Sequence, residues 1–166
     1  KVVGLSSDKA FEPCSPYGHS KAMGESLLLA ANNTRPAGGT IFAVTRYGNV
    51  AGSTGSVIPV WKKMIDDGVH IVPVTDPDCT RFWMTAHEAV ALVATTIASM
   101  KGGELNIPTW LPAFRIGDLA EVMGVQMDIR GLNPFEKMHE SMTHGCSSDT
   151  ARRLTVDEIW GRINEL

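Results

Sequence analysis

The sequence predicts an α/β protein built around a parallel sheet, and three segments near its start carry that prediction. Residues 2–6 and 40–46 are short apolar runs of the kind that form buried strands, and residues 16–33 have the length and spacing of a helix. Two strands joined by a long helix imply a right-handed parallel crossover. Strands and helices keep alternating further along the chain, which favours the α/β class.

The other elements follow from apolar runs and the residues that interrupt them. In the helix 16–33 an apolar stripe is formed by Met23, Leu27, Leu28 and Ala31. A loop rich in proline and glycine follows it. Further helices are predicted over 56–67, 86–100, 116–123, 136–142 and 156–166, and further strands over 70–74, 81–85, 104–107 and 127–130.

Composition excludes several classes of protein. The chain has 166 residues, 43% of them hydrophobic and 20% charged, as in an ordinary globular domain. A net charge of -3 gives no sign of a nucleic-acid or anionic-membrane partner. No apolar run reaches the ~18 residues of a membrane span. The 3 cysteines are widely spaced, which predicts neither a disulfide framework nor a metal site and fits the cytoplasm.

Residues 15–21 pair a phenol with an amine at the start of a helix. Ser15 suits the N-cap and Pro16 the first helical position. Tyr17 and Lys21, four residues apart, then share one helix face. A nearby cation favours tyrosinate, whose ordinary pKa is about 10, so Tyr17 could remove a hydroxyl proton. The alternative is a surface tyrosine and lysine without chemistry.

Polar residues follow the first predicted strand directly. Ser6, Ser7, Asp8 and Lys9 stand at its carboxyl end, where ligands bind in open α/β sheets. With Tyr17 they supply the parts of an acid–base site. The alternative is a polar turn that Ser7 or Asp8 caps.

These two motifs together resemble the extended short-chain dehydrogenase/reductases. The Asp8-Lys9 pair narrows the resemblance to the polysaccharide-biosynthesis (CapD-like) branch, the inverting UDP-N-acetylglucosamine 4,6-dehydratases. The order and rough spacing of further motifs agree over residues 1 to about 142: Arg46-Tyr47-Gly48-Asn49-Val50, Gly55-Ser56-Val57-Ile58-Pro59, Thr80-Arg81-Phe82-Trp83-Met84-Thr85 and Phe135-Glu136-Lys137-Met138-His139-Glu140.

The resemblance implies a division of the chain. Residues 1–55 would be the C-terminal part of a Rossmann-like, NADP-binding domain, residues 56–142 mainly a small mixed α/β substrate-binding region, and residues 143–166 a tail with a helix. The sequence has no glycine-rich dinucleotide fingerprint. We therefore expect the C-terminal portion of a longer enzyme, inactive alone and a homo-oligomer in its full length.

The resemblance also assigns catalytic roles. Tyr17 would take the C4 hydroxyl proton of the sugar, and Lys21 would lower the pKa of Tyr17 and contact the nicotinamide ribose. Ser7 would donate to the 4-oxygen, Lys9 would remove the C5 proton, and Asp8 would protonate the departing 6-hydroxyl. As a base Lys9 must be neutral, which requires desolvation to lower its pKa. The alternative is a solvated, charged lysine.

Two sets of binding residues follow from the same resemblance. NADP, with NAD as the alternative, would contact Ser6, Tyr17, Lys21, Tyr47, Gly48, Asn49 and Val50. The nucleotide sugar would contact Arg46, Asn49, Ser56, Val57, Ile58, Arg81, Arg130 and Glu136. Helix N-termini and arginine forks both suit phosphate. The alternatives are a structural ion pair for Arg46 and a surface position for Arg81.

The sequence departs from the family pattern at one place. Where the family commonly has Arg-Pro-Gly-Glu-Lys, this chain has Asn133 and Phe135 in place of the arginine and the glycine. Arg130 is the candidate replacement. A charged contact to phosphate is worth about 1.5–3 kcal/mol, so the substitution affects nucleotide affinity.

Three functions remain open. The first is an NADP-dependent, C5-inverting UDP-N-acetylglucosamine 4,6-dehydratase for surface polysaccharide or modified-sugar biosynthesis. The second is a sugar-nucleotide 4-epimerase, against which the Asp8-Lys9 pair argues, because an epimerase needs no C5 base. The third is a non-catalytic nucleotide-sugar-binding module.

Overall fold

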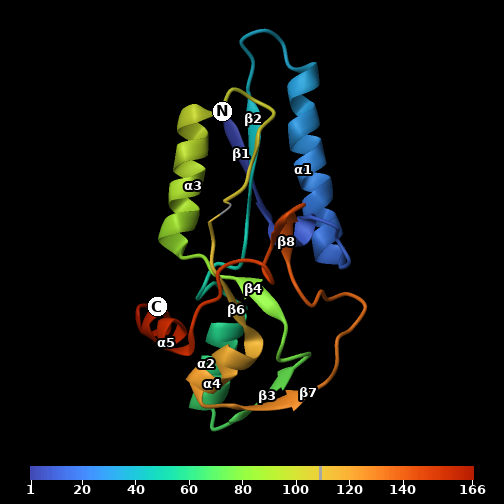
Figure 1. The fold of residues 1–166 in the computed structure, drawn as a ribbon. Coiled ribbons are helices and arrows are strands. Elements are labelled where there is room, and N and C mark those ends of the chain that lie inside the picture. Colours follow the sequence, from blue (N-terminus) through green and yellow to red (C-terminus); the bar gives the residue numbers. More distant parts are fainter. Residues whose placement is uncertain (109) are drawn as a thin grey trace.

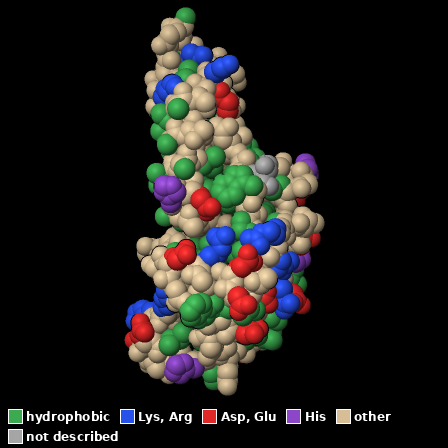
Figure 2. All heavy atoms as spheres, turned by 60° about the vertical axis from the view of Figure 1, so that its left-hand side comes forward, with side chains coloured by type: hydrophobic (Ala, Val, Ile, Leu, Met, Phe, Trp, Pro, Cys, Tyr) green, Lys and Arg blue, Asp and Glu red, His purple; other side chains and the backbone are tan. Residues whose placement is uncertain are grey.

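The computed structural model describes residues 1–108 and 110–166 and has two regions (Figure 1). The upper region, residues 1–50 and 86–108, holds a parallel sheet between two helices. The lower region, residues 51–85 and 110–166, holds three helices and short strands. On the face shown in Figure 2, acidic and basic side chains are interspersed, without a large area of one sign.

The upper sheet confirms the predicted α/β class and its parallel crossover. Its strands are β1 (Val2–Ser7), β2 (Phe42–Tyr47) and β5 (Leu105–Asn106), all parallel, in the order β1-β2-β5. Helices α1 (Pro16–Thr34) and α3 (Ala86–Ser99) lie on opposite sides of the sheet (Figure 1). Ser7 pairs in register with Tyr47, so the first two strands end at the same level.

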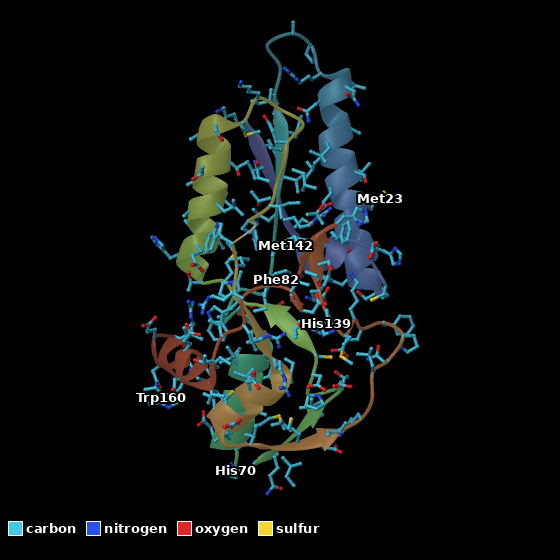
Figure 3. The ribbon with its side chains drawn as sticks, viewed as in Figure 1. Met23, His70, Phe82, His139, Met142 and Trp160 are labelled. Carbon is cyan, nitrogen blue, oxygen red and sulfur yellow. The ribbon has the colours of Figure 1, made fainter. Side chains whose placement is uncertain are left out.

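Helix α1 begins at the predicted residue but buries less of its apolar stripe than the sequence pattern indicated. The Ser15 hydroxyl caps it by accepting from the Gly18 N–H at 3.1 Å. Gly4 lets the helix approach β1, because a Cβ there would stand 2.2 Å from a methyl of Leu28. Met23 and Leu27 are instead 62% and 65% exposed, and Met23 points outward in Figure 3. The sequence pattern alone does not show which part of the stripe meets the sheet.

The lower region closes around an apolar core. Helices α2 (Val57–Asp66), α4 (Ile116–Met123) and α5 (Val156–Asn164) cover the parallel pair β3 (Ile71–Val74) and β7 (Gln126–Ile129) and the antiparallel pair β4 (Thr80–Phe82) and β6 (Ala113–Arg115). Trp83, Leu119 and Ile159 are among its buried side chains. Phe82 and Met142 form a second cluster where the two regions meet (Figure 3).

The predicted helix over 136–142 is wrong. Residues 141–143 are instead β8 (Ser141–Thr143), which pairs with β9 (Cys146–Ser147). The backbone before it is held along β4, because the Thr80 N–H donates to the Met138 carbonyl and Thr80 bridges to His139. A helix would remove these bonds. The short strands β6, β8 and β9 were not predicted, since their partners are distant in sequence.

The strand predicted over 81–85 ends early for a local reason. Thr85 is the N-cap of α3 and forms a capping box with Glu88. Asp8–Ala10 forms a short 3-10 helix, η1, directly after β1. Among the described residues, no helix is both long and apolar enough to cross a membrane.

Candidate active site

A pocket opens at the carboxyl ends of β1 and β2, which we call the strand-end pocket. Its volume is about 240 Å³. It brings together every residue that the sequence analysis proposed for catalysis or cofactor binding. Its lining is Leu5, Ser6, Ser7, Asp8, Lys9, Tyr17, Lys21, Tyr47, Gly48, Asn49, Val50 and Ser53.

Ser7, Asp8 and Lys9 form one hydrogen-bonded unit in this pocket. The Ser7 hydroxyl accepts from the backbone N–H of Lys9 and donates to Asp8 Oδ1 at 2.9 Å. Lys9 Nζ lies 3.1 Å from the same oxygen. Asp8 is fully buried, and its Oδ2 has no hydrogen-bond partner among the described residues. Ser7 therefore is a cap, but the turn also holds a buried, incompletely satisfied carboxylate.

Tyr17 and Lys21 reach the pocket from the first turns of α1. A Cβ at Gly18 would stand 2.5 Å from the Lys9 carbonyl oxygen, so the glycine lets the helix pack directly on η1. Lys21 Nζ donates to the Leu5 carbonyl at 3.1 Å and lies 5.6 Å from the centre of the Tyr17 ring. The phenol, half exposed, is thus beside an ammonium and opposite the Asp8–Lys9 unit.

The charge state of Lys9 differs from the one that the sequence analysis required. Burial, the largest single effect, lowers the pKa of Lys9. The carboxylates of Asp8 and Glu140 together raise it by more, so the pKa lies above the ordinary 10.5. Without substrate Lys9 is therefore an ammonium, and its use as a base needs a route for its proton.

A second, larger pocket lies on the other side of Lys9, and we call it the charged pocket. Its volume is about 370 Å³. Lys9 and Asn49 line both pockets. The remaining lining comes from the loop before α1, from β4 and from the segment ahead of β8: Cys14, Ser15, Arg81, Asn133, Phe135, Glu136, Lys137 and Glu140.

Two of the proposed nucleotide contacts face each other in the charged pocket. Arg81 Nη2 lies 3.1 Å from Glu136 Oε1, and Nη1 of the same arginine donates to the Met138 carbonyl. The substituted residues Asn133 and Phe135 line the same pocket. Arg81 is thus a buried, oriented guanidinium at the pocket wall rather than a freely solvated surface residue.

Arg46 is not among the residues that line either pocket. Its guanidinium forms a buried pair with Glu25 of α1, with Nε 2.8 Å from Oε1, and donates to the Met142 carbonyl of β8. The geometry therefore matches the alternative of a structural ion pair. Sequence analysis missed Glu25, although it is the only acidic residue in the segment that forms α1.

The remaining proposed substrate residues lie apart from the charged pocket. Ser56 is the N-cap of α2, and with Val57 and Ile58 it meets Asn49 beside the core of the lower region. Ile58 is only 3% exposed. Arg130 is two-thirds exposed and pairs with Asp128 two residues earlier, at 2.9 Å. The structure does not bring Arg130 to the place left by Asn133.

Sequence analysis gave no role to Glu140, which lies beside Lys9, or to Lys137, which lies beside Glu140. Glu140, 3% exposed, has Oε1 3.4 Å from Lys9 Nζ and Oε2 3.6 Å from Lys137 Nζ. Lys137 also donates to the Phe11 carbonyl. Their spacing of three residues was visible in the sequence, but the backbone path that brings Glu140 to Lys9 and Lys137 to Glu140 was not.

The strand-end pocket fits one end of a nicotinamide dinucleotide. Its volume is below the ~300–1,000 Å³ of pockets that enclose a drug-sized ligand. The oxygens Ser6 Oγ and Asn49 Oδ1 are buried without partners among the described residues. At Gly48, which lines the pocket, a Cβ would stand 2.5 Å from the Phe82 side chain, so a larger residue does not fit there without displacing its neighbour. Lys21 and Tyr17 supply donors for a ribose.

The parallel sheet between helices, with pockets at its strand ends, defines a Rossmann-like α/β fold. The solved dTDP-glucose 4,6-dehydratase of Streptomyces venezuelae superposes on 98% of this chain and 58% of its own, with a TM-score of 0.76 and 18% identity. Pen from Bacillus thuringiensis superposes on 99% of this chain and 61% of its own, with a TM-score of 0.89 and 30% identity. The model for the family described as polysaccharide biosynthesis protein matches residues 1–160, and the chain belongs to this family.

Curated relatives carry two kinds of activity. The UDP-N-acetylglucosamine 4,6-dehydratase (inverting) of Campylobacter jejuni is 42% identical over 144 residues, which are 86% of this chain and 43% of the relative. The UDP-glucose 4-epimerase of Rickettsia typhi is 39% identical over 97% of this chain and 47% of the relative. The chain therefore spans about half the length of these relatives.

Proposed function

We propose that this chain is part of a nucleotide-sugar 4,6-dehydratase that acts on UDP-N-acetylglucosamine and inverts the configuration at C5. The observation that carries the proposal is the Asp8–Lys9 pair, which lines the strand-end pocket with Tyr17 and whose Lys9 also lines the charged pocket. A dehydratase needs a base and an acid at neighbouring carbons in addition to the group that acts at C4. The 42% identity to the Campylobacter jejuni dehydratase supports the same reaction.

The first task of the site is at C4 of the sugar. Tyr17 removes the C4 hydroxyl proton, the Lys21 ammonium beside it stabilises the phenolate, and the Ser7 hydroxyl donates to the 4-oxygen. A bound nicotinamide cofactor supplies the oxidation at C4 and the later reduction at C6. The residues that would hold this cofactor are Ser6, Tyr17, Lys21, Tyr47, Gly48, Asn49 and Val50.

The second task is the loss of water across C5 and C6. The 4-ketone makes the C5 proton acidic, Lys9 removes it, and Asp8 protonates the departing 6-hydroxyl. The burial of Asp8 suits this exchange, because water does not compete for its proton. No net oxidation remains at the end, which makes the reaction a lyase reaction.

The charged pocket is the proposed site of the nucleotide. Arg81 takes the diphosphate and Glu136 the ribose hydroxyls, so the pair that they form with each other separates when the nucleotide binds. Asn49 contacts the substrate from its place between the pockets. With Asn133 at the wall, Arg81 carries more of the phosphate binding than in relatives with an arginine there.

The proposal also includes the cofactor, the oligomeric state, the cellular location and the pathway of the enzyme. We propose NADP as the cofactor, with NAD as the alternative, in a homo-oligomeric cytoplasmic enzyme of surface-glycan or modified-sugar biosynthesis. The solved relatives support a nicotinamide cofactor, since the Streptomyces venezuelae dehydratase was solved with NAD. The name of the Staphylococcus aureus relative, a capsular polysaccharide biosynthesis protein, supports the pathway class.

A 4-epimerase is the second candidate, favoured by the Rickettsia typhi relative. Proton NMR in D2O separates the two, with the full-length protein, UDP-N-acetylglucosamine and NADP. A dehydratase gives a 4-keto-6-deoxy sugar with deuterium at C5, whereas an epimerase gives a C4 epimer that keeps its 6-hydroxyl.

Two matched variants assign the steps. Lys9→Met is expected to abolish the 6-deoxy product while leaving oxidation at C4, and Tyr17→Phe to abolish both. Retained dehydration in Lys9→Met would remove Lys9 from the proposed mechanism. The absence of a 4-keto sugar from the wild-type protein, with no cofactor binding, would favour a nucleotide-sugar-binding module.

A further inference from the structure

Glu140 is a buried carboxylate to which the proposed mechanism gives no task. It reaches Lys9 with one oxygen and Lys137 with the other, at 3.4 and 3.6 Å. Its backbone is fixed, since its N–H donates to the Ser148 hydroxyl at 2.9 Å and that hydroxyl donates to the Thr80 carbonyl. A buried carboxylate is costly unless it is paired. Its two ammonium neighbours therefore account for its presence beside the acid–base pair.

The two carboxylates that hold Lys9 are compensated differently. Asp8, fully buried, has its ion pair with Lys9 and a further donor in the Ser7 hydroxyl. Glu140 has Lys137 as well as Lys9. When Lys9 gives up its charge, Asp8 loses its counter-ion, whereas Glu140 keeps one. Asp8 is thus the carboxylate that gains more from taking the proton.

We propose that Glu140, with Lys137 as its counter-charge, is a positioning residue that holds the Lys9 amine against Asp8 and directs the Lys9 proton to Asp8. The inference rests on the dehydratase function proposed above. An N–H bond of Lys9 breaks, its electron pair stays on nitrogen, and an O–H bond forms at Asp8 Oδ1, 3.1 Å away. One transfer produces both the neutral amine that removes the C5 proton and the acid that the 6-hydroxyl needs.

The elimination then restores the starting pair. Lys9 takes the C5 proton and becomes an ammonium, and the C5–H electron pair forms the C5–C6 double bond. The C6–O bond breaks with its electrons on oxygen, and the proton on Asp8 completes a water molecule. Atoms and charges balance across the elimination without an outside proton, and Lys9 and Asp8 return to their ammonium and carboxylate forms.

The charge state of Lys9 in the absence of substrate agrees with this proton transfer. The titratable groups around the Lys9 amine are Asp8, Glu140 and Arg81, with Glu136 and Lys137 in the charged pocket and Tyr17 and Lys21 in the strand-end pocket. Burial lowers the pKa of Lys9 and Arg81 lowers it further, but the two carboxylates raise it above the ordinary value. The resting site therefore holds the ammonium and the carboxylate between which the proton moves.

Titration of Lys9 in the full-length protein tests the contact without any activity. Reductive methylation with 13C-formaldehyde gives each lysine a dimethyl-amine NMR signal, and Lys9→Arg identifies the one from Lys9. We expect the pKa of Lys9 to fall in Glu140→Gln, which removes a carboxylate, and to rise in Lys137→Met, which removes a competing cation. The exposed Glu121→Gln is the matched control and should leave it unchanged.

Single-turnover NMR in D2O tests the direction of the proton. In Glu140→Gln the 4-keto sugar that keeps its 6-hydroxyl should form at the wild-type rate, while deuterium exchange at C5 falls about 10- to 100-fold, as for a misplaced catalytic group. KM should change by less than about threefold. A merely structural role for Glu140 would slow both steps.

Two results overturn the inference: an unchanged Lys9 titration in Glu140→Gln, or equal slowing of C4 oxidation and C5 exchange. Failure of the proposed function looks different, since the wild-type protein would then make no 4-keto sugar. In that case the titration still decides whether Glu140 raises the pKa of Lys9 and Lys137 lowers it.

Discussion

The upper and lower regions of this molecule are each stabilised by a different kind of interaction. The lower region has a continuous apolar core that includes Trp83, Leu119 and Ile159. Among the largest fully buried apolar side chains of the described residues, Val44 alone comes from the upper region. The upper region instead buries the Arg46–Glu25 pair and Asp8 and relies on strand pairing and close glycine contacts.

This difference matters because the proposed chemistry lies where the regions meet. The acid–base groups belong to the upper region and depend on polar contacts, whose strength falls sharply when one partner is removed. The proposed nucleotide contacts depend on backbone that packs against the apolar core. Substitutions should therefore act differently in the two regions, which four experiments on the free energy of unfolding can establish.

The largest effect is expected at the ion pair of the upper region. Arg46→Met leaves Glu25 buried without its partner and should lower the free energy of unfolding by about 3–5 kcal/mol. Urea unfolding measures it. The double variant Arg46→Met, Glu25→Leu should recover most of the loss, because an apolar pair has no charge to compensate. Equal losses in both variants would mean that the charge is not the cause.

The next largest difference between the regions in the free energy of unfolding is expected when a core side chain is truncated. Leu119 is fully buried, so Leu119→Ala is expected to cost about 2–5 kcal/mol. Its matched control is Leu27→Ala on α1, where the side chain is 65% exposed and the expected change is within about 0.5 kcal/mol. A large loss at Leu27 would show that the exposed face of α1 is covered in solution.

Two glycines of the same helix test the close contact beside the site. Gly18→Ala places a methyl against the Lys9 carbonyl and should cost about 1–3 kcal/mol. Gly24→Ala meets no atom within 4 Å and should stabilise the helix by about 0.5–1 kcal/mol. The same sign for both changes would contradict the close packing of α1 on η1.

The smallest effect concerns the pH dependence of stability through Lys9. Its pKa is raised above 10.5 in the folded protein, so its contribution is fully present below pH 10.5 and is lost as the pH rises through the folded pKa. The stability difference between wild type and Lys9→Met should thus be constant near neutral pH and shrink above pH 10.5. Urea midpoints across this range measure it, and a difference that grows with pH would contradict the sign.

Sequence patterns predicted the elements whose causes are local. Ser15 and Pro16 mark the start of α1, and helix α4 has the bounds expected from its apolar spacing. The order of motifs also indicated which residues would line the strand-end pocket. The helix bounds depend on neighbours within a few positions, which a single sequence displays, whereas the pocket lining followed from the resemblance to the family.

The features that sequence patterns missed depend on partners far along the chain. The segment 136–140 has helical composition, yet its backbone pairs with Thr80 through the Met138 carbonyl and a bridge at His139. This pairing places Glu140 beside Lys9 and Lys137 beside Glu140. The sequence allowed both a ligand and an ion-pair interpretation of Arg46, and only the position of Glu25 on α1, in contact with Arg46, separates them.

The bond from Lys137 to the Phe11 carbonyl joins residues 126 positions apart. Closing so long a loop costs entropy before any contact compensates for it, so such contacts form late in folding. During synthesis Asp8 and Lys9 are made well before Lys137 and Glu140, because the two pairs are far apart in sequence. In a refolding experiment, the titration of Lys9 would therefore report when the segment around residue 140 docks on the segment around residue 9.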